Sequence, residues 1–249
     1  DVFGNGLIES EKFKLLGAIS QREIFIDPNP DIKKSYAERK RLFESKEGGW
    51  AHYDTSIISK GGGIYKRNDK QIELSEEIQK LLKITETTLS GEELCKKLLT
   101  LDVDLLFNGG VGTYVKASDE NNLDLGDKQN EAVRVNANEL RAKIVSEGGN
   151  LGFTQKARIE YALNGGRINQ DAIDNSGGVN TSDHEVNLKI LLNVIKNEGL
   201  LNEQQAKDTL QSLTQDVVAL VLKSNYDQSC VISIDEQFSR RYPSDYIKV

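Results

Sequence analysis

The central part of the chain alternates short apolar runs with glycine-rich turns. The run AKIVS at 142–146 is β-prone, and EGGN at 147–150 follows it. Apolar residues recur at helical spacing over 153–163, and a second strand is predicted over 167–174, directly before NSGG at 175–178. This order predicts a strand–helix–strand unit whose strands both end at an asparagine beside glycines. In open parallel sheets, ligands bind outside the carboxyl ends of the strands.

A third apolar run, VDLLF at 103–107, ends at the sequence NGG. Right-handed crossovers would bring the ends of all three strands to one edge of a sheet. We therefore expect Asn108, Asn150 and Asn175 to open onto one cleft. A single asparagine beside glycine is commonly a turn former. Three such strand ends instead favour a dinucleotide site, because an amide donates and accepts hydrogen bonds at once.

The first six residues, DVFGNG, are similar to the end of a dinucleotide-binding loop. Gly4, Asn5 and Gly6 would allow a tight turn before a helix whose N-terminus faces a pyrophosphate. The chain begins inside this turn and contains no methionine. We therefore expect it to be a portion of a larger protein that lacks the first strand of the nucleotide fold.

Two further strands are predicted over 14–20 and 23–27. In the doubly wound pattern the second strand ends in an acidic residue that hydrogen-bonds the adenosine ribose. Here Ser20 takes that place, and Arg22, two residues later, could meet a 2′-phosphate. Both NAD and NADP remain open on this evidence, and Asp27 is interpreted as a structural residue of the following turn.

Helical patterns cover most of the rest of the chain. A capping box begins at Ser90, and Ser182 or the next residue is predicted to cap a helix that runs to about residue 197. A hydroxyl at that positive helix end would suit a carboxylate. The tail after residue 222 is interpreted as the start of a further segment. The predicted helices cover 31–45, 74–82, 92–99, 183–197 and 202–222.

The charge and the cysteine content narrow the classes of partner and the cellular setting that fit the chain. The 249 residues include 32 basic and 39 acidic side chains, for a net charge of −7, which argues against nucleic acid or an anionic membrane surface as the main partner. The two cysteines, Cys95 and Cys230, cannot form a disulfide framework, and Cys95 is expected to be a buried apolar residue. With no signal-peptide pattern and no membrane-length apolar run, we expect a soluble, cytoplasmic protein with a small-molecule partner.

Several motifs can be set aside. His184-Glu185 lacks the second histidine of a zinc motif, because position 188 is leucine, and no metal site is predicted. In SKGGG at 59–63 the lysine precedes the glycines, whereas a phosphate-binding loop has the reverse order. The chain also lacks the G-x-S-x-G pattern of serine hydrolases.

The pattern EGGN, followed by NSGGV and a serine, is similar to the nicotinamide-binding half of the amino-acid dehydrogenases, where the patterns are EGAN and NAGGV followed by serine. From residue 1 to about residue 192 the chain more closely resembles the large, bacterial, NAD-specific glutamate dehydrogenases. The segments that carry this resemblance are DVFGNG, IFIDPNPD, SYAERKRLF, SKGGGIY, DLLFNGGVGTYVKAS, EGGNLGFTQ and IEYALNGGRINQDAIDNSGGV.

The fold implied is α/β, with a Rossmann-like doubly wound parallel sheet followed by C-terminal helices. Residues 1–174 would form the NAD-binding domain, and 175–249 would lead back toward a substrate domain. The family's reaction is oxidative deamination of L-glutamate to 2-oxoglutarate and ammonia. In this family the catalytic lysine and aspartate precede the glycine loop, so the resemblance implies no catalytic residue within the chain. The expected cofactor-binding residues are Gly4, Asn5, Gly6, Ser20, Asn108, Gly109, Gly148, Asn150 and Asn175.

In the resembling family, the serine that matches Ser182 binds the substrate's side-chain carboxylate, which favours glutamate over apolar amino acids. Two alternatives remain: a non-catalytic dinucleotide-sensing module, and an amino-acid dehydrogenase of other specificity. We expect the full-length protein to be a homo-oligomer, with neither nucleic acid nor membrane as a partner.

Overall fold

We describe a computed structural model of the chain over residues 10–45, 48–110 and 112–247. The chain divides into two compact units, which are described separately. The sheet unit comprises Asp1–Glu147 and Leu151–Ile168, and the helical unit comprises Gly148–Asn150 and Asn169–Val249. The domain division predicted after residue 174 remains a prediction.

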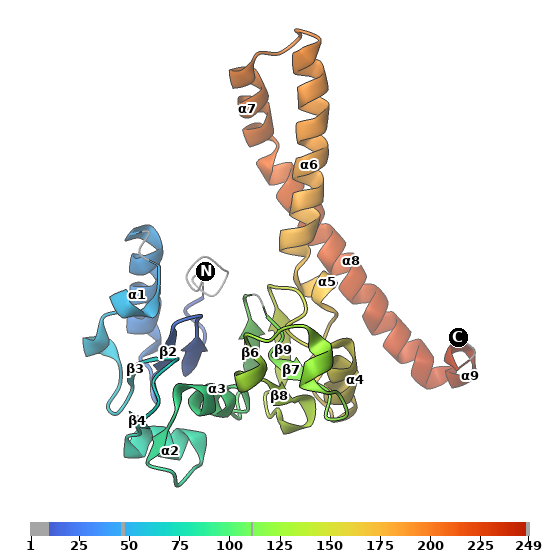
Figure 1. The fold of residues 1–249 in the computed structure, drawn as a ribbon. Coiled ribbons are helices and arrows are strands. Elements are labelled where there is room, and N and C mark those ends of the chain that lie inside the picture. Colours follow the sequence, from blue (N-terminus) through green and yellow to red (C-terminus); the bar gives the residue numbers. More distant parts are fainter. Residues whose placement is uncertain (1–9, 46–47, 111, 248–249) are drawn as a thin grey trace. The chain divides into compact units, whose positions relative to one another are not determined.

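The predicted α/β class is confirmed by a three-stranded parallel sheet in the sheet unit and by the helices of the helical unit. The sheet has the order β10-β9-β6, formed by Arg167–Ile168, Ile144–Glu147 and Leu105–Asn108. Helix α4, Gln155–Leu163, connects β9 to β10. The predicted strand–helix–strand order is therefore present, and Figure 1 labels its first strand, β9, and its helix, α4.

Apolar side chains of α4 and its preceding turn cover this sheet. Phe153, Ala157 and Tyr161 are buried in one cluster with Val145 of β9. The hydroxyl of Tyr161 donates to the carbonyl of Ala142 at 2.6 Å. Burial of this face fixes α4 against the sheet, because removing apolar surface from water contributes roughly 25 cal/mol per Å².

The strand predicted over 167–174 is much shorter than expected. It ends at Ile168, and Asp171–Asp174 forms the short helix α5. Aspartates in the first turn of a helix are favoured by its dipole, and the N–H of Asn175 donates to the carbonyl of Asp171 at 2.7 Å. The prediction that Asn175 directly follows a parallel strand is therefore wrong: it lies between α5 and α6.

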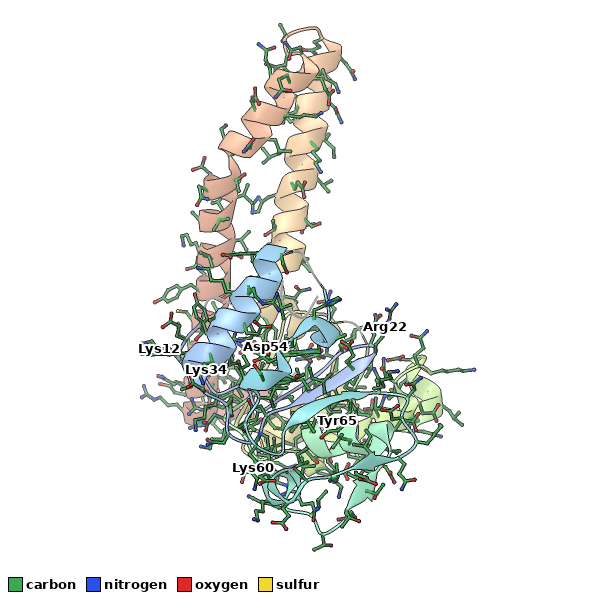
Figure 2. The ribbon with its side chains drawn as sticks, turned by 90° about the vertical axis from the view of Figure 1, so that its left-hand side faces the viewer. Lys12, Arg22, Lys34, Asp54, Lys60 and Tyr65 are labelled. Carbon is green, nitrogen blue, oxygen red and sulfur yellow. The ribbon has the colours of Figure 1, made fainter. Side chains whose placement is uncertain are left out.

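The strands predicted near the start of the chain are present but form an antiparallel sheet. Its order is β1-β2-β3, formed by Gly17–Ile19, Glu23–Ile26 and Gly63–Lys66. Ser20 therefore follows a strand whose neighbour is antiparallel, not a second parallel strand. Figure 2 labels Arg22, in the turn between β1 and β2, and Tyr65, on β3.

Helix α1, Ile32–Ser45, lies between β2 and β3 in the chain, and four of its residues are buried: Ser35, Glu38, Arg39 and Leu42. Next to it, Trp50 is fully buried and stacks on Phe25, with 4.3 Å between ring centroids. Short elements complete the sheet unit, and the capping box at Ser90 is confirmed. They are β4 Ile72–Glu73, β5 Thr88–Leu89, β7 Val115–Lys116, β8 Val135–Asn136, α2 Glu76–Leu82, α3 Gly91–Leu99, and the 3-10 helices Trp50–His52, Thr55–Ile57, Asn122–Leu125, Glu131–Val133 and Ala137–Glu139.

The helical unit contains two long helices, α6 and α8, which pack against each other, with α7 between them in the chain (Figure 1). The single helix predicted over 202–222 is wrong, because the chain breaks at Leu213 into two helices, and the tail continues the second one. The helices of this unit are α5, α6 Ser176–Asn197, α7 Glu203–Ser212, α8 Thr214–Arg241 and α9 Pro243–Tyr246.

The start of α6 also differs from the prediction. It begins at Ser176, so Ser182 lies inside the helix and does not cap it. Glycines are weak helix formers, which is why the sequence at 177–178 argued for a later start. A residue far away in the chain stabilises the junction between α5 and α6. The side-chain amide of Asn225 on α8 donates to the carbonyl of Ile173 at 2.7 Å and to the hydroxyl of Ser176 at 2.9 Å.

Candidate functional site

In the sheet unit, two predicted strand ends lie side by side. Asn108 is the last residue of β6 and is the register partner of Glu147, the last residue of β9. The Nδ2 atom of Asn108 is buried and has no hydrogen-bond partner in the part of the chain that the structure describes. A Cβ placed on Gly152 would lie 1.6 Å from that nitrogen. A side chain at 152 would therefore displace the amide from the strand end.

A buried ion pair supports the end of β9. Arg158 on α4 approaches Glu147 at 2.8 Å, and the two side chains are 6% and 0% exposed. The Arg158 guanidinium also lies over the ring of Phe153, 5.8 Å from its centroid. Buried charges are stable only when paired, so this pair fixes the residue from which the EGGN loop departs.

In the helical unit, the two central asparagines of the prediction contact each other. The Nδ2 atom of Asn175 donates to Oδ1 of Asn150 at 3.1 Å. Neither Nδ2 of Asn150 nor Oδ1 of Asn175 has a further hydrogen-bond partner among the described residues. The pair therefore presents one donor and one acceptor. One cleft shared with Asn108 remains a prediction.

The remaining predicted site residues are more dispersed. Ser20 uses its hydroxyl in the turn, accepting from the backbone N–H of Glu23 at 2.9 Å. Ser182 is exposed on α6, and Gly109 and Gly148 are also exposed. Gly4, Asn5 and Gly6 lie outside the described residues.

The structural interpretation of Asp27 agrees with its contacts. It is buried, and its Oδ1 accepts from the hydroxyl of Ser59, from the N–H of Ser59 at 3.2 Å and from the N–H of Asn29 at 3.2 Å. These bonds tie β2 to the loop before β3. Because these hydrogen bonds occupy the carboxylate, Asp27 is a structural residue of the turn.

Burial raises the pKa of the Cys95 thiol to about 11, so its nucleophilic thiolate is scarce at neutral pH. Among the described residues, no group of three or more histidine, cysteine or acidic side chains could hold a metal ion. The helices of that same part of the chain are also too short or too polar to cross a bilayer.

The sequence interpretation missed a set of residues around Thr113. Arg134 is buried between Val133 and Val135 and donates to the carbonyl of Thr113 at 2.8 Å. A charged residue inside an apolar run is an available signal, because arginine is seldom fully buried without partners. The role of Asn225 had no comparable signal, since its partners lie about fifty residues away in the chain.

Comparisons with known proteins agree with the family resemblance found in the sequence. The family described as bacterial NAD-glutamate dehydrogenase, catalytic domain, matches residues 1–235. The chain is 49% identical over 246 residues to the NAD-specific glutamate dehydrogenase of Pseudomonas aeruginosa, covering 99% of this chain and 15% of that protein. The enzymes of the same name from Halomonas elongata and Mycobacterium tuberculosis are 47% and 48% identical, over 97% and 92% of this chain.

The chain spans about 15% of the length of these curated relatives. The match nevertheless covers nearly all of the chain, including both strand ends and the asparagine pair. The chain therefore belongs to the bacterial NAD-glutamate dehydrogenase catalytic domain family.

Proposed function

We propose that the chain is the cofactor-binding part of an NAD-dependent glutamate dehydrogenase. The observation that carries the proposal is the contact between Asn150 and Asn175. Its remaining donor and acceptor complement a carboxamide, which also has one amide donor group and one carbonyl acceptor. The names of the relatives specify NAD and glutamate, and the site chemistry is compatible with both.

The described residues fit a dinucleotide in two respects. Asn108 has a buried amide nitrogen without a partner, and such donors are uncommon in folded proteins. Gly109 and Gly148 are exposed beside predicted contact residues, where the absence of a side chain lets a ligand approach the backbone. When bound, NAD would accept a hydride from the amino acid. The residues of this chain would bind and orient it.

We assign the substrate side of the site to Ser182. Its hydroxyl is exposed on α6, and a hydroxyl can donate to the side-chain carboxylate of L-glutamate. Ser182→Ala in the full-length enzyme should raise the KM for glutamate more than that for NAD. Equal changes in both would remove the basis for this assignment. The wider proposal is a cytoplasmic, homo-oligomeric enzyme without nucleic acid or membrane partners.

The central test compares two isosteric substitutions in the full-length dehydrogenase. Asn150→Asp keeps the acceptor for Asn175 but removes the donor and adds a charge, whereas Asn193→Asp makes the same chemical change on an exposed face of α6. In the bound complex, a cofactor carboxamide left without one hydrogen-bond partner costs about 1–3 kcal/mol, which predicts a KM for NAD raised by about fivefold to 150-fold.

The control variant should stay within about twofold of the parent enzyme, because an exposed substitution changes little. If Asn150→Asp behaves like Asn193→Asp, the asparagine pair is not part of the cofactor site. If the parent enzyme binds NAD but shows no turnover with glutamate, a dinucleotide-sensing module is the better description.

A further inference from the structure

We infer that Thr113 is a positioning residue for cofactor binding. Its hydroxyl fastens the segment after β6 to the segment after the EGGN loop, and Asp127 and Arg134 hold it in place. The inference rests on the proposed function, and it concerns residues that make no proposed contact with the cofactor. It accounts for a group of buried polar side chains that the cofactor contacts alone leave unexplained.

All three polar groups of Thr113 are engaged, each with a different part of the sheet unit. Its N–H donates to Oδ2 of Asp127 at 2.8 Å, and its carbonyl accepts from Nε of Arg134 at 2.8 Å. Its hydroxyl donates to the carbonyl of Leu151 at 2.8 Å. The following backbone continues the link, because the N–H of Tyr114 donates to the carbonyl of Gly152 at 2.8 Å.

The described contacts of Arg134 all lie around Thr113 and Asp127. Its side chain is 0% exposed, and besides Thr113 it donates to Oδ1 of Asn122 at 3.1 Å and to the carbonyl of Asp127 at 2.7 Å. Its Nη2 also lies 3.7 Å from Oδ2 of Asp127. A guanidinium offers donors in a fixed planar fork, so one buried arginine sets the relative positions of three loop segments.

Asp127 completes the arrangement. Partial burial raises its pKa, but hydrogen bonds from Asn130 and Thr113 and the charge of Arg134 lower it more, so the pKa lies below its ordinary value. The amide of Asn130, which donates to Asp127 at 2.9 Å, would lie 2.2 Å from a Cβ on Gly112. Gly112 also has φ +110°, a conformation that strongly favours glycine.

The described residues on either side of the exposed glycines are held in place. Asn108 is fixed at the end of β6, Thr113 is fixed by its three partners, and Gly109 and Gly110 are exposed between them. Residues that are already held in place lose less conformational entropy when a ligand binds. Removing the Thr113 hydroxyl should therefore weaken cofactor binding without changing any proposed contact.

The experiment uses three variants of the full-length dehydrogenase. Thr113→Val replaces the hydroxyl with a methyl group, Thr113→Ser retains it, and Thr100→Val is the matched control. The Thr100 hydroxyl also donates to a backbone carbonyl of the same unit, that of Lys96 at 3.0 Å, but at the end of α3. Steady-state measurements give kcat and the KM for NAD and for glutamate, and thermal melting with and without NAD checks folding and binding.

Thr113→Val should raise the KM for NAD by about fivefold to tenfold, the equivalent of one hydrogen bond. Its kcat and its KM for glutamate should stay within about twofold of the parent, and Thr113→Ser should restore the KM for NAD. A purely structural role would lower the melting temperature without separating the two KM values.

Three results would overturn the inference: equal changes in both KM values, failure of Thr113→Ser to restore binding, or a Thr113→Val enzyme that matches Thr100→Val. If Thr113→Val does not fold, an impaired KM for NAD in a folded Thr113→Ser enzyme also counts against it. Absence of glutamate-dependent NAD reduction in the parent enzyme would instead refute the proposed function. Normal parent turnover with an unaffected Thr113→Val variant would refute the positioning role alone.

Discussion

The buried pair of Glu147 and Arg158 allows a quantitative test of what holds the end of β9. Arg158→Met keeps an unbranched side chain of similar length but removes the charge that lies 2.8 Å from the Glu147 carboxylate, which is 0% exposed. Breaking a buried pair from one side costs about 3–5 kcal/mol. Loss of the guanidinium over Phe153 adds about 0.5–2 kcal/mol. We expect a loss of unfolding free energy of about 5 kcal/mol.

The assay follows directly from the sequence, because Trp50 is the only tryptophan in the chain. It is fully buried in the sheet unit, the same unit as the ion pair. Urea unfolding followed by its fluorescence therefore reports the unit in which the substitution lies. Far-UV circular dichroism, recorded on the same samples, tests whether that unit unfolds in one transition.

A double variant supplies the control. Glu147→Leu with Arg158→Met replaces both charged groups by apolar groups of similar volume, and such a replacement of a buried pair is often close to neutral in stability. We expect the double variant to recover more than half of the free energy lost by Arg158→Met alone. A loss below about 1 kcal/mol in the single variant, or a double variant as unstable as the single one, would refute this account of the pair.

Three further outcomes follow from the two cysteines and from contacts within the sheet unit. In the native chain at pH 8, a thiol reagent should modify Cys230, which is partly exposed, and spare Cys95, whose pKa is raised to about 11 by burial; rapid modification of both would contradict the buried assignment. Hydrogen bonds from a neighbouring arginine lower the pKa of Glu38, so its stabilising contribution is present above the ordinary glutamate pKa and is lost as the pH falls through its lowered folded value. Glu38→Gln should therefore reduce stability at pH 7, and urea midpoints of variant and parent should converge below about pH 4.3. Gly152→Ala should destabilise the chain by more than about 1 kcal/mol in the same assay, because its Cβ would lie 1.6 Å from the Asn108 amide nitrogen; an unchanged midpoint would mean that this amide moves freely.

Sequence reasoning succeeded where a local pattern determines the structure. The apolar spacing of α4 and the capping box at Ser90 both depend on residues within one or two helical turns. The two glycine-flanked motifs singled out Asn150 and Asn175, whose side chains contact each other in the structure, although the sequence did not predict that contact.

It failed where distant residues decide the local conformation. The glycines at 177–178 indicated a turn. Instead, hydrogen bonds from Asn225 stabilise the junction between α5 and α6, and α6 begins at Ser176. Likewise, the apolar run around Arg134 signalled a buried charge that needs partners, but no local pattern identified Thr113 as one of them. Helix propensity is a weak preference that tertiary contacts override.

The order of strands in the parallel sheet also bears on how the chain folds. Ile144 of β9 pairs with Arg167 of β10 on one side and with Leu105 of β6 on the other, and the first pairing closes the shorter stretch of chain. Closing a shorter loop costs less conformational entropy, and folding rates rise as contacts become more local. We therefore expect β9, α4 and β10 to assemble first and β6 to join afterwards. On this sequence of events, the hydroxyl link from Thr113 to Leu151 forms late, so its loss should accelerate unfolding while leaving the refolding rate nearly unchanged.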